Sequence, residues 1–159
     1  SVWLHHAREG RPVEVVPILC GSFAQFVAGQ ADPAQDARFA RTLRVLSQAM
    51  TARRTIVVAA ADLAHVGPAF DGRPVREEGQ SALRAADDAL LRRMTAGSAE
   101  DFFDELKAVE DRNNVCGLPP IYLTLRLLGE PRGHAVAYDQ CPADEQDTSW
   151  VSVAGLVWQ

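Results

Sequence analysis

The chain has 159 residues, of which 47% are hydrophobic and 23% are charged, a balance typical of one globular domain with ample core. A formal net charge of -5 at pH 7, with no basic stripe, argues against a nucleic-acid partner and an anionic membrane surface. No stretch approaches the roughly 18 consecutive apolar residues of a membrane-spanning helix. Three cysteines without a C-x-x-C spacing favour a reducing, cytoplasmic location. Because the chain opens at Ser1 without an initiator Met, we expect it to be part of a longer protein.

The first half of the chain carries strand-like and helical patterns in turn. Residues 13–19 form an apolar run that predicts a buried strand. Residues 56–61 are continuously apolar and begin with β-branched residues, which predicts a central strand covered on both faces. Between them, residues 34–50 predict a helix because apolar residues recur on one face. That face consists of Phe39, Leu43, Leu46 and Met50.

The second half predicts three helices followed by two closing strands. A loop at residues 67–79 precedes these helices. Ser98, with Asp101 three residues later, forms an acidic variant of the capping box and so predicts the start of the helix at 98–109. The order of elements along the whole chain, β-α-β-α-α-α-β-β, indicates an α/β layered fold whose last two strands form an antiparallel edge. The helices are predicted at 81–95, 98–109 and 120–128, and the strands at 134–138 and 150–158.

Asp62 and His65 directly follow the predicted strand 56–61 and lie three residues apart. Ligands in open α/β sheets bind at the carboxyl ends of strands, and a turn here would point both side chains into one cleft. Asp62 could orient the imidazole of His65, or both could face a metal ion or a substrate. The alternative is that Asp62 caps the following turn while His65 packs beside it.

Cys116 lies in the polar loop 111–117, directly before the predicted helix 120–128. The thiolate is the nucleophilic and metal-binding form of cysteine, and a helix N-terminus favours it. Cys116 is therefore the strongest candidate for a nucleophile or a soft metal ligand. The alternative is a half-buried structural thiol, since free cysteines are among the most buried residues.

The remaining cysteines and histidines are weaker candidates. Cys20 follows the predicted strand 13–19 and could border a cleft, but a core cysteine is the favoured interpretation. Cys141 lies in a long polar loop and is interpreted as incidental. A surface pair, His5 and His6, and an isolated His134 offer no clear ligand set.

The chain lacks the G-x-G-x-x-G, P-loop, H-E-x-x-H and G-x-S-x-G motifs, which argues against nucleotide binding, a zincin and an α/β-hydrolase. Two other segments are more informative together: DLAHVG at residues 62–67, and NVCG at 114–117 with Pro120 and Ile121 following. They resemble the Memo-like family, whose bacterial members are called AmmeMemoRadiSam system protein B. VVPILCG at 15–21 and DTSWVSVAG at 147–155 resemble the opening and closing strands of its carboxyl-terminal part.

This resemblance implies a fold. The family resembles class III extradiol dioxygenases of the LigB type, which hold non-haem iron with two histidines and a carboxylate. A layered α/β/α sandwich around a central, mostly parallel sheet is therefore implied. Residues 1–159 would form a single Memo-like domain that lacks the amino-terminal part of the family fold. The family's amino-terminal histidines and its Glu-His-Ser segment have no counterpart in this chain.

The resemblance also implies a metal-assisted redox enzyme that acts on an unknown small substrate. The implied catalytic residues are Asp62, His65 and Cys116. His65 and Cys116 would be the metal ligands, and Asp62 would orient His65. Iron or copper suits an imidazole with a thiolate, and zinc is less expected. Two alternatives stay open: a non-catalytic module that binds a peptide or protein in the same cleft, and a relative whose site has decayed. Self-association is a further expectation about partners.

Overall fold

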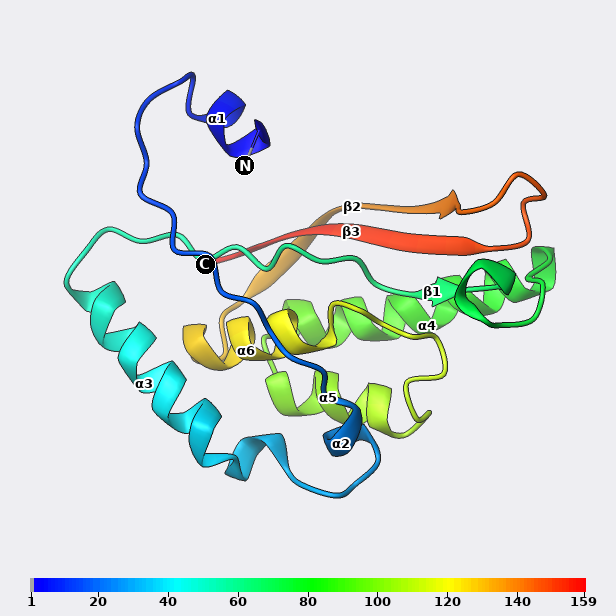
Figure 1. Ribbon diagram of the computed structural model, residues 1–159, viewed down its shortest axis with the longest axis horizontal. Helices are drawn as coiled ribbons and strands as arrows, with labels where there is room; N and C mark the ends of the chain where they lie inside the picture. The colour runs from blue at the N-terminus through cyan, green and yellow to red at the C-terminus, as the bar shows by residue number, and fades with distance from the viewer. Residues whose placement is uncertain (1) are drawn as a thin grey trace.

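The computed structural model describes residues 2–159 as two layers, a small sheet and a group of helices (Figure 1). Ser1 lies outside the described residues. The helices are α1 (Val2–Ala7), α2 (Ala24–Val27), α3 (Ala37–Thr51), α4 (Glu77–Ala96), α5 (Ala99–Lys107) and α6 (Leu118–Leu128), with 3-10 turns η1 (Pro33–Gln35) and η2 (Pro68–Phe70). The strands are β1 (His65–Val66), β2 (Gly133–Pro142) and β3 (Trp150–Trp158). Helix α4 contacts β2 and β3 on one side and α5 on another, and α6 lies between α5 and α3.

The four predicted helices form as α3 to α6, with boundaries shifted by a few residues, whereas α1 and α2 were not predicted. The four residues predicted as the apolar face of α3 are its half-buried residues, and the other positions of that helix are exposed. Asp36 caps α3, and Ser98 caps α5 by accepting a hydrogen bond from the Asp101 N–H at 3.1 Å. Gly129 ends α6 in the left-handed region, with φ of 70°. None of the described helices is long and apolar enough to cross a bilayer.

The hydrophobic core lies between the helices and the inner face of the sheet. Met94 of α4, Phe102 of α5 and Leu125 of α6 are each at most 2% exposed. Trp158 of β3 joins the two layers, because its indole N–H donates to the Met94 carbonyl at 2.8 Å. Burying a large apolar side chain stabilises a fold by about 1.5–3 kcal/mol. This packing holds β3 against the helices. It therefore also holds β1, which pairs with the first residues of β3.

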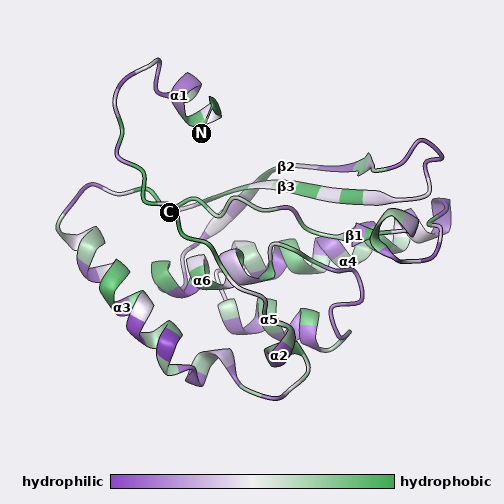
Figure 2. Cartoon of the chain, in the orientation of Figure 1, coloured by the Kyte–Doolittle hydropathy of each residue, from purple (hydrophilic) through white to green (hydrophobic). Residues whose placement is uncertain are grey.

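Two of the predicted strands, 13–19 and 56–61, are not strands. Both segments are extended, but neither belongs to a strand ladder in the described part of the chain. Leu19 is 100% exposed and Ile56 is 88% exposed, and most of both runs is open to solvent, although the half-buried Ala59 packs against the core. Figure 2 shows hydrophobic residues along both extended segments. The prediction was wrong because an apolar run becomes a strand only where a neighbouring strand offers hydrogen bonds.

The α/β class is confirmed, but the mostly parallel central sheet is not found in the part of the chain that the structure describes. The three strands pair antiparallel in the order β1-β3-β2. Residues 13–19 and 56–61 would have supplied the parallel part, and they remain unpaired. Among residues 2–159 the core helices cover one face of the sheet, which gives two layers in place of an α/β/α sandwich (Figure 1). The closing antiparallel pair, β2 with β3, is confirmed, but β2 extends to Pro142 and so places Cys141, which was predicted in a loop, on a strand paired with Val151.

Candidate metal centre

Asp62, His65 and Cys116 come together beside β1, at the end of the sheet where β3 begins. One ligand atom from each residue lies within 4.8 Å of the other two. The Oδ2 atom of Asp62 is 3.8 Å from Nε2 of His65. The His65 side chain is 16% exposed, whereas Asp62 and Cys116 are open to solvent. The three residues that the sequence singled out therefore share one small volume at the surface.

Hydrogen bonds fix the orientation of the His65 ring. Its Nδ1 lies 3.2 Å from the Leu63 carbonyl oxygen. Because a carbonyl only accepts, Nδ1 is the donor in this contact, and Nε2 is the ring nitrogen that faces Asp62. The His65 backbone N–H donates to the Asn113 carbonyl at 2.8 Å. The Phe70 ring meets the imidazole edge-on, with centroids 5.0 Å apart, and closes one side of it.

Cys116 is held against the same stretch of backbone. Its N–H donates to the Leu63 carbonyl at 3.2 Å, and its thiol donates to the Asp62 carbonyl at 3.6 Å. The Leu63 carbonyl therefore accepts from both His65 and Cys116. One peptide group ties together two segments that lie about fifty residues apart in the chain.

The loop that carries Cys116 concentrates uncommon backbone conformations. Glu110, Asp111 and Asn114 have φ values of 54°, 47° and 50°, a left-handed region that residues other than glycine seldom adopt. The Asp111 carboxylate stabilises this loop by accepting the Val115 N–H at 2.9 Å, and burial raises the pKa of Asp111. Strained backbone of this kind often occurs at functional sites.

Sequence reasoning missed the support that β3 gives to this centre. The Leu63 N–H donates to the Ser152 carbonyl at 2.9 Å, and the Ser152 N–H donates to the Ala64 carbonyl at 3.0 Å. The buried Ser152 hydroxyl also accepts the Ala64 N–H at 2.9 Å. Ala64 and Ser152 lie 88 residues apart, so no pattern among neighbouring residues predicts this contact. The family-like segment 147–155 was the available signal, and it indicated only a strand.

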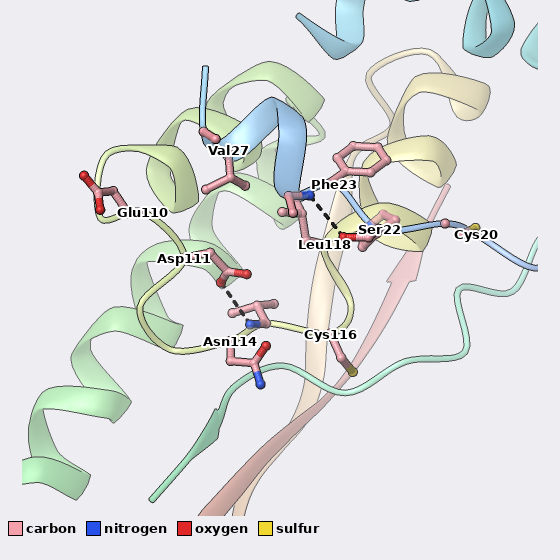
Figure 3. Close-up of a pocket in the computed structure, with 14 residues that line it drawn as sticks. Cys20, Ser22, Phe23, Val27, Glu110, Asp111, Asn114, Cys116 and Leu118 are labelled. Atoms are coloured by element: carbon pink, nitrogen blue, oxygen red, sulfur yellow. Dashed lines mark hydrogen bonds between the residues drawn. The ribbon is translucent and has the colours of Figure 1, made fainter. Parts of the chain in front are cut away.

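A pocket of about 650 Å³ adjoins Cys116 (Figure 3). Its wall combines the segment from Cys20 to Ala28 with the loop around Asp111 and the beginning of α6. In Figure 3 the Glu110 and Asp111 carboxylates lie on one side and Cys20 on the other. Cys20, which the sequence favoured as a core residue, is half-buried in this wall, and burial raises its pKa. The volume is that of a small-molecule site.

The donor set fits a transition metal ion. Imidazole and thiolate suit iron, copper and zinc, and the carboxylate adds a hard ligand. Two ligands at about 2.0–2.3 Å from one ion are at most about 4.0–4.6 Å apart, so modest side-chain rotations would bring all three into range. Three protein ligands also leave a position open, which is the pattern of catalytic metal sites.

The other candidate residues lie away from this centre. His5 and His6 are exposed on α1. His134 and the exposed Cys141 lie on β2. In the described residues, Asp62, His65 and Cys116 form the one group of three side chains placed to hold an ion.

Comparison with models of known protein families identifies a family for this chain. Residues 10–157 match the family model described as Memo-like protein. The matched range covers nearly the whole chain and includes Asp62, His65 and Cys116. None of the curated proteins compared with the chain matched it.

Proposed function

The chain belongs to the Memo-like family, and on that premise we propose that it is a metal-assisted redox protein acting on a small molecule of unknown identity. The observation that carries the proposal is the convergence of an imidazole, a thiol and a carboxylate within 4.8 Å, beside a pocket of about 650 Å³. The resemblance of the family to LigB-type dioxygenases, which use iron, supports a redox metal. Three free cysteines suit a reducing cytoplasm.

Each residue has a role that follows from its contacts. The Nδ1–H of His65 is held by the Leu63 carbonyl, which leaves Nε2 as a ligand or as the atom that receives a proton. Asp62 faces that nitrogen at 3.8 Å, where its carboxylate can orient the imidazole and add a ligand to the same ion. Cys116 borders the pocket and so lies nearest to a substrate bound in it. An iron or copper ion bound by these residues would supply one-electron chemistry and an open coordination position.

Copper(II) is a direct probe of this proposal. One equivalent added to the protein should give a visible absorption band from thiolate-to-copper charge transfer. The band should be lost in Cys116→Ser and weakened in His65→Gln. It should persist in Cys141→Ser, a matched control that removes an exposed cysteine of β2. Ascorbate should bleach the band and air should restore it, as expected of a redox-competent site.

Other copper spectra would contradict the proposal. If no band forms, or if Cys116→Ser gives the same spectrum as the unmodified chain, Cys116 is not a metal ligand. A band that ascorbate bleaches irreversibly would contradict the redox role. Either result would favour the alternative of a non-catalytic module that binds a peptide in the same cleft.

A further inference from the structure

One peptide group, the one that joins Leu63 to Ala64, contacts two of the three candidate ligands. Its carbonyl oxygen accepts from Nδ1 of the His65 ring at 3.2 Å and from the Cys116 N–H at 3.2 Å. Leu63 is 2% exposed and Ala64 is fully buried, so water competes little for these contacts. The direction of this carbonyl therefore sets both the rotation of the imidazole and the position of the Cys116 backbone.

Ser152 of β3 holds the other end of the same peptide group. Its Oγ accepts the Ala64 N–H at 2.9 Å, and the residue is 0% exposed. A peptide group is planar because its C–N bond has partial double-bond character, so its N–H and its carbonyl turn together. By holding the Ala64 N–H, the Ser152 hydroxyl therefore fixes the direction in which the Leu63 carbonyl points.

The backbone of Ser152 does not hold this peptide group. Its carbonyl accepts the Leu63 N–H at 2.9 Å, and its N–H donates to the Ala64 carbonyl at 3.0 Å. The Leu63 N–H belongs to the preceding peptide group and the Ala64 carbonyl to the following one. Without the hydroxyl, the Ala64 N–H would lose its acceptor in a buried place, which is costly. We expect the peptide group to rotate in response.

We infer that Ser152 is a positioning residue for the candidate metal centre, and that it acts through its hydroxyl on the peptide group between Leu63 and Ala64. This inference rests on the proposed function, although the hydrogen bonds are present with or without a metal ion. Removing the outer hydrogen-bond partners of metal ligands commonly lowers metal affinity by about 10–100-fold. We expect the lower end of this range, because Ser152 reaches His65 and Cys116 through one intervening peptide group.

Two serine-to-alanine variants separate this role from a general loss of stability. Ser149→Ala is the matched control, because Ser149 is also 0% exposed and its Oγ accepts the Ala69 N–H at 2.9 Å. The carbonyl of that peptide group belongs to Pro68 and accepts from the Asp71 N–H at 3.3 Å, not from a candidate ligand. In cobalt(II) titrations, Ser152→Ala should bind about 10-fold more weakly than the unmodified chain. Ser149→Ala should bind like the unmodified chain.

Nitrogen-15 spectra of the metal-free proteins measure the contact at His65 directly. The neutral ring of the unmodified chain should carry its hydrogen on Nδ1, because the Leu63 carbonyl accepts from it. Ser149→Ala should keep this form, whereas Ser152→Ala should give a mixture of the Nδ1–H and Nε2–H forms. The Ala64 amide of the unmodified chain should also exchange slowly with solvent, as expected of a buried and hydrogen-bonded group.

Failure of the proposed function alone would appear as no cobalt binding by any of the three proteins, with the ring spectrum of Ser152→Ala still altered. The inference is overturned if Ser152→Ala keeps the ring spectrum of the unmodified chain or binds cobalt with the same affinity. It is also overturned if Ser149→Ala changes both as much. Should Ser152→Ala not fold, the unmodified chain decides: an Nε2–H ring or a rapidly exchanging Ala64 amide overturns the inference, and the opposite pair of results supports it.

Discussion

Gly117 determines how closely the two halves of the candidate site approach each other. A Cβ atom at this position would lie 2.4 Å from the Asp62 carbonyl oxygen and 2.8 Å from Cδ1 of Ile121. The first of these atoms belongs to the backbone and cannot rotate away. Because the Cys116 thiol and the Asp62 carbonyl meet at this same contact, the absence of a side chain at Gly117 is a condition for the cluster.

We expect Gly117→Ala to separate residues 61–63 from the Cys116 loop. Overpacking of this kind typically costs about 1–3 kcal/mol, and cobalt affinity should fall with it. Gly155→Ala is the matched control, since a Cβ there would meet its nearest atoms at 3.9 Å, an ordinary contact. Urea unfolding and cobalt titration measure the two effects. Equal behaviour of the two variants would show that the close approach at Gly117 is unimportant.

Between elements, the buried Asp87 joins α4 to β2, because the Tyr138 hydroxyl donates to its Oδ2 at 2.7 Å. Burial raises its pKa, hydrogen bonds from Tyr138 and Ser152 oppose the rise, and the charges of Asp88 and Arg84 add smaller, opposite contributions. Because the folded-state pKa is raised above the unfolded value, the carboxyl group binds a proton more tightly in the folded chain. Its contribution to stability is therefore complete below the unfolded pKa and is lost as pH rises through the folded pKa.

Asp87→Asn should expose this dependence. As pH rises from about 4, near the unfolded pKa of an aspartate, toward neutrality, the free energy of unfolding of the unmodified chain should decline relative to that of the variant. Asp111, whose pKa burial also raises, is present in both proteins and so cancels in the difference. Urea unfolding at several pH values gives the two curves. A difference that stays constant with pH would mean that the carboxyl group titrates alike in both states.

The sequence predicted helices better than strands because helix signals are local. The half-buried face of α3 and the cap at Ser98 depend on residues within a few positions of one another. The strand at 56–61 was predicted from composition alone, although a strand is defined by a partner that may lie anywhere in the chain. The hairpin of β2 and β3 was predictable because its two halves are close in sequence.

The residues of the candidate site were also predictable only where the signal was local. Asp62, His65 and Cys116 could be proposed because each lies at a recognisable boundary of an element and within a family-like motif. Asp87 could not, because an acidic residue at that point of α4 resembles its half-buried neighbour Asp88 in sequence. Only packing of the sheet on α4 shows which of the two enters the interior.

At the scale of the whole molecule, the two extended segments leave a large amount of apolar surface open. Val16, Leu19, Ile56 and Val58 are 78%, 100%, 88% and 73% exposed. An ion pair between Glu14 and Arg53 brings the beginnings of the two segments together. Apolar surface of this extent is unusual in a monomeric protein and commonly marks an interaction site.

We therefore predict that the chain self-associates as its concentration rises. Its mass in sedimentation velocity should exceed the 17.3 kDa of one chain at high concentration. The double variant Leu19→Lys, Ile56→Lys should remain a monomer. Val2→Lys, which changes an 80% exposed residue of α1, is the control and should associate like the unmodified chain. A monomeric unmodified chain over the whole concentration range would contradict the prediction.

X-ray absorption at the zinc edge measures whether Asp62, His65 and Cys116 bind one metal ion together. With one equivalent of zinc bound, we expect one sulfur neighbour at about 2.3 Å and nitrogen or oxygen neighbours at about 2.0–2.2 Å. The sulfur neighbour should vanish in Cys116→Ser and persist in Cys141→Ser. A shell without sulfur, or one that Cys116→Ser leaves unchanged, would contradict the binding of one ion by all three residues.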